Sequence, residues 1–359
     1  MPQFQVGRRG VGDTHPTYFI ADIAANHDGN LPHALDLIRL AAEAGANAVK
    51  FQHFLAERIV SDFGFRALGG QQSHQAAWRK SVFEVYQEAS LPRQWNAALK
   101  KAADDAGVDF FSAPYDLEAV AELDRMGVPA FKLGSGDVTW HEIARAMART
   151  GKPLFIATGA SDLGEVIALV DALRPLDAPL CVMQCNTNYT GSLENFRHIH
   201  LNVLGAYATL FPDVVLGLSD HTPGHSVVLG AVALGARAIE KHFTDDNRRE
   251  GPDHGFSLDP RAWREMVDRT RELEAALGST VKRVAENEAQ TVVLQRRCIR
   301  AARDLAAGEA LRAEDLEVLR PAPAGSLAPW QLPALLGKPL LKSRSKGDHL
   351  RSSDVATDA

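Results

Sequence analysis

The sequence predicts an α/β protein in which a (β/α)₈ barrel is followed by a small second domain. Segments with helical spacing repeatedly end in Gly and are followed by a short apolar run, and eight such runs precede a change in sequence character near Glu286. Buried parallel strands read as continuous apolar runs, and Gly suits the left-handed position that ends a helix. Eight strand-helix units in about 250 residues is the usual size of such a barrel.

The composition and charge of the chain exclude several classes of protein. The chain has 359 residues, of which 45% are hydrophobic and 23% charged, with a net charge of -6. At about 150 residues per domain this length allows two or more globular domains. The net charge attracts neither nucleic acid nor an anionic membrane, three cysteines are too few for a disulfide framework, and we find neither a secretory signal nor a membrane-spanning apolar run. We therefore expect a cytoplasmic protein without nucleic-acid or membrane partners.

Each predicted strand follows directly from its apolar run, and the eight occur in chain order. They are YFIADIAA (18–25), ANAVKFQ (46–52), VDFFSAP (108–114), VPAFKLGSGD (128–137), PLFIATG (153–159), APLCVMQC (178–185), DVVLGLSD (213–220) and ARAIEKHF (236–243). The segments between them are long enough for crossover helices. Residues 53–90 differ, because they do not continue a helix directly and resemble an elaborated loop of the kind that often forms a lid or binding segment.

The helices have recognisable ends. Asn30 can cap a helix that has Pro32 in its first turn and Gly45 as its stop, while residues 262–277 carry an apolar stripe at helical spacing. We place the barrel at residues 1–283, a linker at 284–295 and the second domain at 296–359. A domain of about 60 residues has a marginal core, so we expect it to dock against another surface.

Active sites of such barrels lie at the carboxyl ends of the strands. This rule alone selects candidate residues. The polar residues at these ends are Asp22, Asn26, His27, Lys50, Gln52, Ser112, Lys132, Ser135, Asp137, Thr158, Gln184, Asn186, Thr187, Tyr189, Ser219, Asp220, His221, Glu240, Lys241 and His242. Nearly every strand therefore delivers polar groups to one rim.

Two histidines at this rim suggest a metal site. His221 follows the seventh predicted strand and His242 ends the eighth, so the two lie on neighbouring strand ends. Two imidazoles with carboxylates and water suit Mn²⁺, Co²⁺ or Fe²⁺. The alternative is a pair of hydrogen-bonded rim histidines without a metal.

Lys50 and Lys132 end two apolar runs. A lysine inside a barrel is costly unless an anion meets it, so a phosphate or carboxylate ligand is one interpretation, helped by Ser135. The alternative is pairing with Asp22, Asp137 or Glu240.

Four other residues have a structural interpretation beside the functional one. His27 can carry protons or belong to an Asn-His-Asp-Gly turn, and Asp253 can reach the barrel mouth or belong to a Pro-Asp turn. Cys185 is flanked by apolar residues, and we expect an unreactive buried thiol. Arg320 precedes a Pro-rich loop and is more often structural on sequence grounds.

Seven motifs occur in this order: IADIAANHDGN, GANAVKFQ, FFSAPYD, FKLGSGD, PLFIATGA, LGLSDHTPG and AIEKHFTDDNRREGPDHGFSLDP. Together they resemble the sialic acid synthase family, the N-acetylneuraminate synthases and their nonulosonic-acid relatives. AARDLAAGEALRAEDLEVLRP and the LLGKPL and KGDHL segments resemble the antifreeze-like SAF domain, a β-clip fold, that ends those enzymes. The resemblance covers almost the whole chain.

This resemblance implies a domain-swapped homodimer and a condensation of phosphoenolpyruvate with an open-chain N-acylated aminohexose, giving a nine-carbon 2-keto acid and phosphate. The acceptor would be N-acetylmannosamine or a 2,4-diacylamino sugar. His221 and His242 would hold a divalent metal, usually Mn²⁺, with Mg²⁺ or Co²⁺ as alternatives. The resemblance also implies roles for the other residues: Lys50, Lys132, Ser135, Thr187 and Ser219 at phosphoenolpyruvate; Gln52, Tyr189, Asp253 and a partner SAF domain's Arg320 at the sugar; and Asp22, Asp137, Glu240 and, more weakly, His27 in catalysis.

The chain departs from the family pattern at two places. Asp22 and Asp137 stand where the family usually has Glu, and QCNTNYT replaces the usual sixth-strand motif, with Thr187 where Asn is common. These changes leave the acceptor sugar open. Two rivals stay in view: a phosphoenolpyruvate-condensing barrel acting on another aldose, such as a 3-deoxy-2-keto acid synthase, and a non-catalytic carbohydrate-binding protein.

Overall fold

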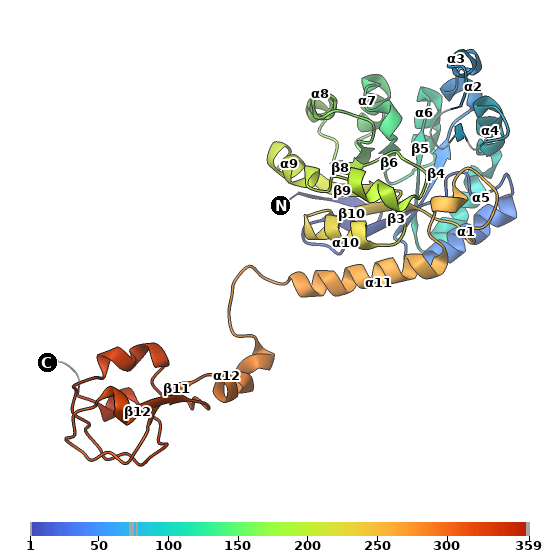
Figure 1. Ribbon diagram of the computed structural model, residues 1–359. Coiled ribbons are helices and arrows are strands. Elements are labelled where there is room, and N and C mark those ends of the chain that lie inside the picture. The colour runs from blue at the N-terminus through green and yellow to red at the C-terminus, as the bar shows by residue number, and fades with distance from the viewer. Residues whose placement is uncertain (1, 72–74, 77, 357–359) are drawn as a thin grey trace. The chain divides into compact units, whose positions relative to one another are not determined.

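The computed structural model describes residues 2–71, 75, 76 and 78–356, and the chain forms two compact units, Met1–Gly278 and Ser279–Ala359 (Figure 1). Each unit has its own hydrophobic core. The predicted linker, residues 284–295, falls within the second unit. Residues 72–74 and 77 of the predicted loop 53–90, and 357–359 of the predicted second domain, lie outside the described residues.

The first unit is a closed barrel of eight parallel strands in the order β10-β3-β4-β5-β6-β7-β8-β9, which confirms the predicted (β/α)₈ fold. The strands are β3 (Tyr18–Asp22), β4 (Ala48–His53), β5 (Asp109–Pro114), β6 (Phe131–Leu133), β7 (Leu154–Ala157), β8 (Leu180–Cys185), β9 (Val215–Asp220) and β10 (Ala238–His242). Seven of these strands lie inside a predicted apolar run, and β4 extends one residue beyond its run, to His53. Most of their residues are buried, because the strands are covered by helices outside and by packed side chains inside.

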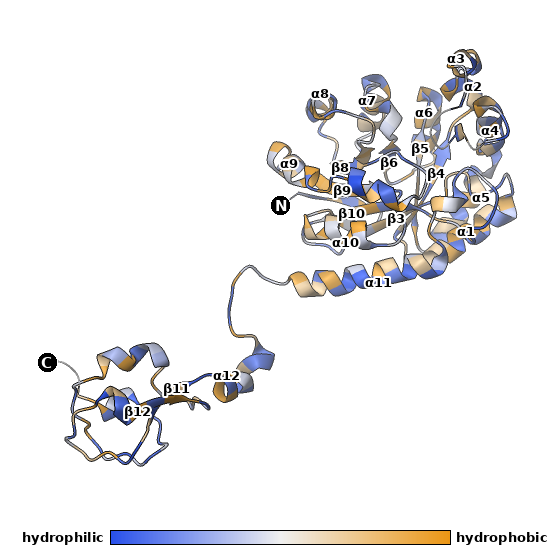
Figure 2. Cartoon of the chain, in the orientation of Figure 1, coloured by the Kyte–Doolittle hydropathy of each residue, from blue (hydrophilic) through white to orange (hydrophobic). Residues whose placement is uncertain are grey.

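Helices surround the barrel and follow its strands. They are α1 (Leu31–Glu43), α5 (Asn96–Asp105), α6 (Leu117–Arg125), α7 (His141–Ala148), α8 (Leu163–Leu173), α9 (Val203–Leu210), α10 (Ser226–Ala233) and α11 (Pro260–Leu277). The predicted ends of α1 are confirmed: Asn30 accepts a hydrogen bond from the His33 N–H at 3.1 Å, and Gly45 has a φ of 98°. Figure 2 shows polar and apolar residues mixed along α11, whose buried stripe includes Trp263 and Met266.

The predicted loop 53–90 contains short helices. They are α2 (Ala56–Ile59), α3 (Asp62–Ala67) and α4 (Val82–Ala89). The ends of two of them are fixed by serine caps, since Ser61 caps α3 and Ser81 forms a capping box with Glu84 at the start of α4. The described part of this segment therefore contains regular structure, which follows β4 in the chain.

A hairpin that the sequence analysis did not predict covers the opposite end of the barrel. It consists of β1 (Gln3–Val6) and β2 (Arg9–Gly12), and its Phe4 ring packs edge-on against Phe155, with centroids 5.7 Å apart. Asp109, at the start of β5, accepts hydrogen bonds from Arg9 at 3.1 Å and from the Tyr18 hydroxyl at 2.8 Å. The hairpin is thus tied to the amino ends of the strands.

The second unit is small and rich in turns. It contains α12 (Ala289–Gln295) and an antiparallel pair, β11 (Cys298–Ala301) and β12 (Leu316–Leu319), joined by isolated bridges to the rest of the unit. Short 3₁₀ helices in the described parts of the two units include Arg93–Trp95, Ser135–Asp137, Arg174–Leu176, Leu193–His198, His254–Phe256, Glu286–Glu288, Ala313–Asp315, Pro329–Ala334 and Ser352–Asp354. Among the described residues, no helix is long and apolar enough to cross a membrane.

Candidate active site

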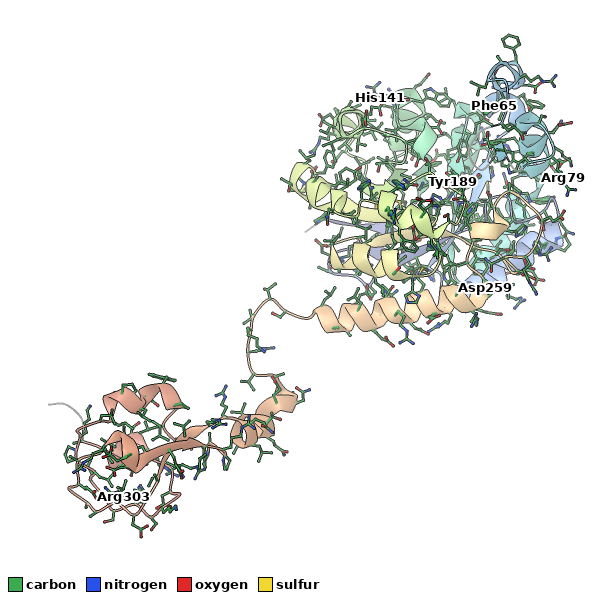
Figure 3. The ribbon with its side chains drawn as sticks, viewed as in Figure 1. Phe65, Arg79, His141, Tyr189, Asp259 and Arg303 are labelled. Atoms are coloured by element: carbon green, nitrogen blue, oxygen red, sulfur yellow. The ribbon has the colours of Figure 1, made fainter. Side chains whose placement is uncertain are left out.

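A cavity of about 650 Å³ opens at the carboxyl ends of the barrel strands. The predicted site residues that line it are Asp22, Lys50, Gln52, Lys132, Ser135, Asp137, Thr187, Tyr189, Ser219, His221, Glu240 and His242. Figure 3 shows Tyr189 near the middle of the barrel unit and Phe65, another lining residue, on α3. The strand-end rule therefore selected residues that the fold brings to one cavity.

Two buried lysines converge on one carboxylate. Lys132 Nζ lies 3.4 Å from Glu240 Oε1, and Lys50 Nζ lies 3.9 Å from the same oxygen. Lys50 also donates a 2.7 Å hydrogen bond to Asp22. Burial alone would lower the pKa of Lys50, but Asp22 and Glu240 raise it above its ordinary value, so the ammonium form is favoured. The alternative prediction, in which the lysines pair with carboxylates, is confirmed for Asp22 and Glu240. The same pairing brings both ammonium groups close to Glu240 Oε1.

The two carboxylates have different surroundings. Asp22 accepts hydrogen bonds from Lys50, from the Gln52 amide at 3.3 Å and from the Ala24 N–H at 3.1 Å. Glu240 Oε1 accepts a hydrogen bond from the Ser219 hydroxyl at 3.2 Å, whereas its Oε2 atom is buried without a hydrogen-bond partner. Glu240 therefore retains an acceptor atom for a substrate or water.

The rings of His221 and His242 lie side by side, with centroids 5.3 Å apart. His221 Nδ1 donates a 2.8 Å hydrogen bond to the Asn186 carbonyl, which leaves its Nε2 as the lone-pair nitrogen. His242 Nδ1 is buried without a hydrogen-bond partner. Burial, His221 and Lys50 hold the pKa of His242 well below its ordinary value, so the ring is neutral, as a metal ligand must be.

These features fit a divalent metal held by two protein ligands. Within the part of the chain that the structure describes, no group of three or more His, Cys, Asp or Glu side chains has a metal-binding arrangement. The remaining coordination positions would belong to water or substrate oxygens. Such an open site suits Mn²⁺ or Co²⁺, whereas a structural zinc ion is usually held by four protein ligands.

Cys185 differs from its sequence interpretation in one respect. The thiol is buried, as expected, but it lines the cavity rather than the core. Burial alone would raise its pKa, but interactions with His221 and Ser135 lower it below the ordinary value. The thiol is therefore part of the surroundings of His221.

Asp137 and Ser135 lie on the 3₁₀ turn after β6. The Ser135 hydroxyl accepts a hydrogen bond from the Gly159 N–H at 3.0 Å. Burial raises the pKa of Asp137 to about 6, against a smaller opposing effect of Lys132, and its Oδ2 atom has no hydrogen-bond partner. Asp137 can therefore change protonation state near neutral pH.

Three of the residues to which the family resemblance gives a role are not part of the cavity lining. Asp253 accepts a hydrogen bond from the Ala25 N–H at 3.1 Å, its Oδ2 atom lies 3.9 Å from His242 Nδ1, and burial raises its pKa to about 6. His27 is buried against the edge of Trp95, and burial lowers its pKa to about 4. Arg320 belongs to the second unit, where it is exposed.

The cavity also has an aromatic side that the sequence analysis missed. Tyr115 and Tyr86 line it, and the ring of Phe54 lies between them, with centroid separations of 5.9 and 5.3 Å. Tyr115 directly follows the strand-ending Pro114, so the strand-end rule could have selected it. Tyr86 belongs to α4, and its position depends on how the segment 53–90 folds.

The chain matches two family models: the NeuB family over residues 37–282 and the SAF domain over residues 296–356. It is 33% identical to an N,N'-diacetyllegionaminic acid synthase from Legionella pneumophila, over 96% of both chains. It is 33% identical to a human N-acetylneuraminate-9-phosphate synthase, over 77% of this chain and 75% of that one. A crystal structure of a sialic acid synthetase from Leptospira borgpetersenii, in complex with citrate, superposes with a TM-score of 0.71 at 25% identity, covering 81% of this chain and 95% of that one.

Proposed function

The chain belongs to the NeuB family and ends in a SAF domain, and from this premise we propose that it is a nonulosonic acid synthase. It condenses phosphoenolpyruvate with an open-chain N-acylated aminohexose, either N-acetylmannosamine or a 2,4-diacylamino sugar. The products are a nine-carbon 2-keto sugar acid and phosphate. The observation that carries the proposal is the convergence of Lys50 and Lys132 beside the His221–His242 pair in one cavity.

The lysines hold the anionic substrate. Both ammonium groups are buried, so their attraction for the phosphate and carboxylate of phosphoenolpyruvate is screened less than at the surface. Ser135, Thr187 and Ser219 line the same cavity and offer hydroxyl groups to the phosphate oxygens. As phosphate leaves, these groups stabilise the charge that develops on it.

His221 and His242 hold a divalent metal, Mn²⁺ in preference to Mg²⁺ or Co²⁺. When bound, this metal polarises the aldehyde oxygen of the sugar and makes its carbon more electrophilic. Burial favours the neutral form of the His242 imidazole, and the Asn186 carbonyl orients the His221 imidazole.

The bond changes of the proposed reaction require proton transfers, which the carboxylates can carry out. C3 of phosphoenolpyruvate forms a bond to the aldehyde carbon, water adds at C2, and the bond between C2 and the phosphate oxygen breaks. One water proton reaches the former aldehyde oxygen and the other leaves with phosphate. Glu240, with its unpartnered Oε2, accepts a proton from the water, and Asp137, with a pKa of about 6, can return one. Asp22 keeps Lys50 and Gln52 in position.

Gln52, Tyr189 and Asp253 orient the sugar in this proposal. Arg320 reaches its acyl group from a second copy of the chain, which requires a domain-swapped homodimer. The aromatic side formed by Tyr86 and Tyr115 gives apolar surface for acyl groups.

The test uses metal-stripped protein supplied with phosphoenolpyruvate and Mn²⁺. N-acetylmannosamine and a set of 2,4-diacylamino hexoses are offered separately, phosphate release is followed, and products are identified by mass. We expect turnover with one class of sugar, dependent on added Mn²⁺ and lost in His221→Ala. Absence of phosphoenolpyruvate binding would contradict the proposal.

A further inference from the structure

A buried ion pair lies directly behind the two histidines. Lys241 Nζ donates to Asp220 Oδ2 at 2.5 Å, and both side chains are only 1% exposed. The two residues are opposite each other in the parallel pairing of β9 with β10. The pair therefore joins the carboxyl ends of two neighbouring strands.

Each histidine is the chain neighbour of one member of this pair. His221 follows Asp220 and His242 follows Lys241. Side chains alternate between the two faces of a strand, and the two histidines line the cavity whereas Asp220 and Lys241 do not. The ion pair and the histidine pair thus occupy opposite faces of the same two strand ends.

The ion pair also holds the residue after His221. Thr222 donates hydrogen bonds to Asp220 Oδ1 from its N–H at 3.1 Å and from its hydroxyl at 2.9 Å. Lys241 Nζ donates to the Thr222 carbonyl at 2.6 Å. His221 is therefore fixed at both of its chain neighbours, while its own Nδ1 is fixed by the Asn186 carbonyl.

Stability alone does not account for such a pair. Removing two charges from water is costly, and apolar residues of similar volume often stabilise a fold as well or better. A charge pair differs from apolar packing because it fixes distance and direction between two points. Here those points are the chain neighbours of the two histidines.

We propose that Asp220 and Lys241 are positioning residues whose ion pair, together with Thr222, sets the spacing of His221 and His242 for a divalent metal. This inference rests on the metal site of the proposed function. Groups that orient metal ligands typically change metal affinity about 10–100-fold when they are removed. The charged pair thus determines metal affinity, whereas its contribution to folding can be replaced by apolar contacts.

The experiment compares the wild-type chain with the double variant Asp220→Asn/Lys241→Met, which removes both charges and nearly preserves shape. Mn²⁺ affinity is measured by electron paramagnetic resonance, phosphoenolpyruvate affinity by calorimetry, and stability by thermal unfolding. We expect Mn²⁺ affinity to fall about 10–100-fold, with phosphoenolpyruvate affinity and the unfolding temperature close to those of the wild type. Unchanged Mn²⁺ affinity would overturn the inference.

Two further variants make the result specific. Thr222→Val removes one hydroxyl and leaves both charges, so it should fold and lose Mn²⁺ affinity several-fold, and wild-type affinity in it would also overturn the inference. Arg9→Met/Asp109→Asn removes an ion pair at the opposite end of the barrel and should leave Mn²⁺ affinity unchanged. A wild-type chain that binds phosphoenolpyruvate but not Mn²⁺ would overturn the metal site itself, and this failure is seen before any variant is compared.

Discussion

At the scale of residues, the cavity is governed by buried charges that neutralise one another until a substrate arrives. Glu240 lies between Lys50 and Lys132, and Asp22 pairs with Lys50. Breaking such a pair leaves an unpaired buried charge, which an incoming anion can satisfy. In the proposed function, the same side chains compensate one another's charge in the free protein and bind the substrate.

Glu240→Gln should separate binding from turnover. The neutral amide leaves both ammonium groups free for phosphoenolpyruvate, so we expect its dissociation constant to fall several-fold, while kcat falls by roughly 10²–10⁴ through loss of the proton acceptor. Calorimetry and steady-state phosphate release measure the two effects. Glu122→Gln, in an ion pair of α6 outside the cavity, is the control and should change neither. Weaker phosphoenolpyruvate binding with an unchanged kcat would show that Glu240 has only a structural role.

Asp137 should make stability depend on pH. Its folded-state pKa of about 6 exceeds the ordinary 3.8, so the native state binds the proton more tightly than the unfolded chain. This tighter proton binding adds to the free energy of unfolding. The added stability is complete below about pH 4 and is lost as the pH rises through 6. Asp137→Asn should therefore be more stable than wild type at pH 8, by roughly 1–2 kcal/mol after allowing for partial exposure. Urea unfolding at pH 4 and pH 8 tests this, and an equal difference at both pH values would contradict it.

At the scale of elements, the two ends of the barrel have separate tasks. The amino end is covered by the β1–β2 hairpin and held through Asp109, whereas the carboxyl end carries the cavity. Loops at the carboxyl end, including α2 to α4, shape the cavity without entering the barrel. Stability and specificity can therefore be changed independently.

Asp109→Ala should affect stability alone. The change removes the acceptor for the buried Tyr18 hydroxyl and for Arg9, so we expect a loss of about 1–3 kcal/mol in the free energy of unfolding. Urea unfolding gives this value, and calorimetry should find phosphoenolpyruvate bound as in the wild type. A large fall in that affinity would mean that the two ends of the barrel are coupled.

Phe65→Ala should affect the sugar alone. Phe65 lies on α3 at the outer part of the cavity, in a segment separate from the strands that carry the two lysines (Figure 3). Loss of this apolar surface should raise the KM for the accepted sugar several-fold without changing phosphoenolpyruvate affinity. Phe63→Ala is a matched control, because Phe63 is on the same helix but 84% exposed. Equal effects of both variants would show that α3 does not contact the sugar.

Some of these helices and strands could be predicted from the sequence, and others could not. All eight barrel strands were predicted because buried parallel strands leave uninterrupted apolar runs. The β1–β2 hairpin and α2 to α4 were missed as elements because they are short, and short elements depend on tertiary contacts rather than on local pattern. The strand-end rule found most of the polar side chains that line the cavity. It could not predict that Lys132 lies near Glu240, because the two residues are on strands far apart in the sequence.

At the scale of the whole molecule, the barrel carries the cavity and the second unit carries Arg320. In the proposed homodimer, each site combines one barrel with the Arg320 of the other copy. Mixing inactive Arg320→Ala chains with inactive His221→Ala chains, after unfolding and refolding together, should then restore about a quarter of the wild-type activity. Half of the randomly formed dimers contain one chain of each kind, and one of the two composite sites in such a dimer is intact. No restoration would show that both residues must be on the same chain.

In the proposed condensation, the bond between C2 of phosphoenolpyruvate and the phosphate oxygen breaks. Phosphoenolpyruvate labelled with oxygen-18 at that bridging position tests it directly, with Mn²⁺ and the accepted sugar present. We expect the released phosphate to retain the label, because water adds to C2 and not to phosphorus, and we expect labelled phosphate and the 2-keto acid in equal amounts. Unlabelled phosphate, or phosphate released without the nine-carbon product, would contradict it.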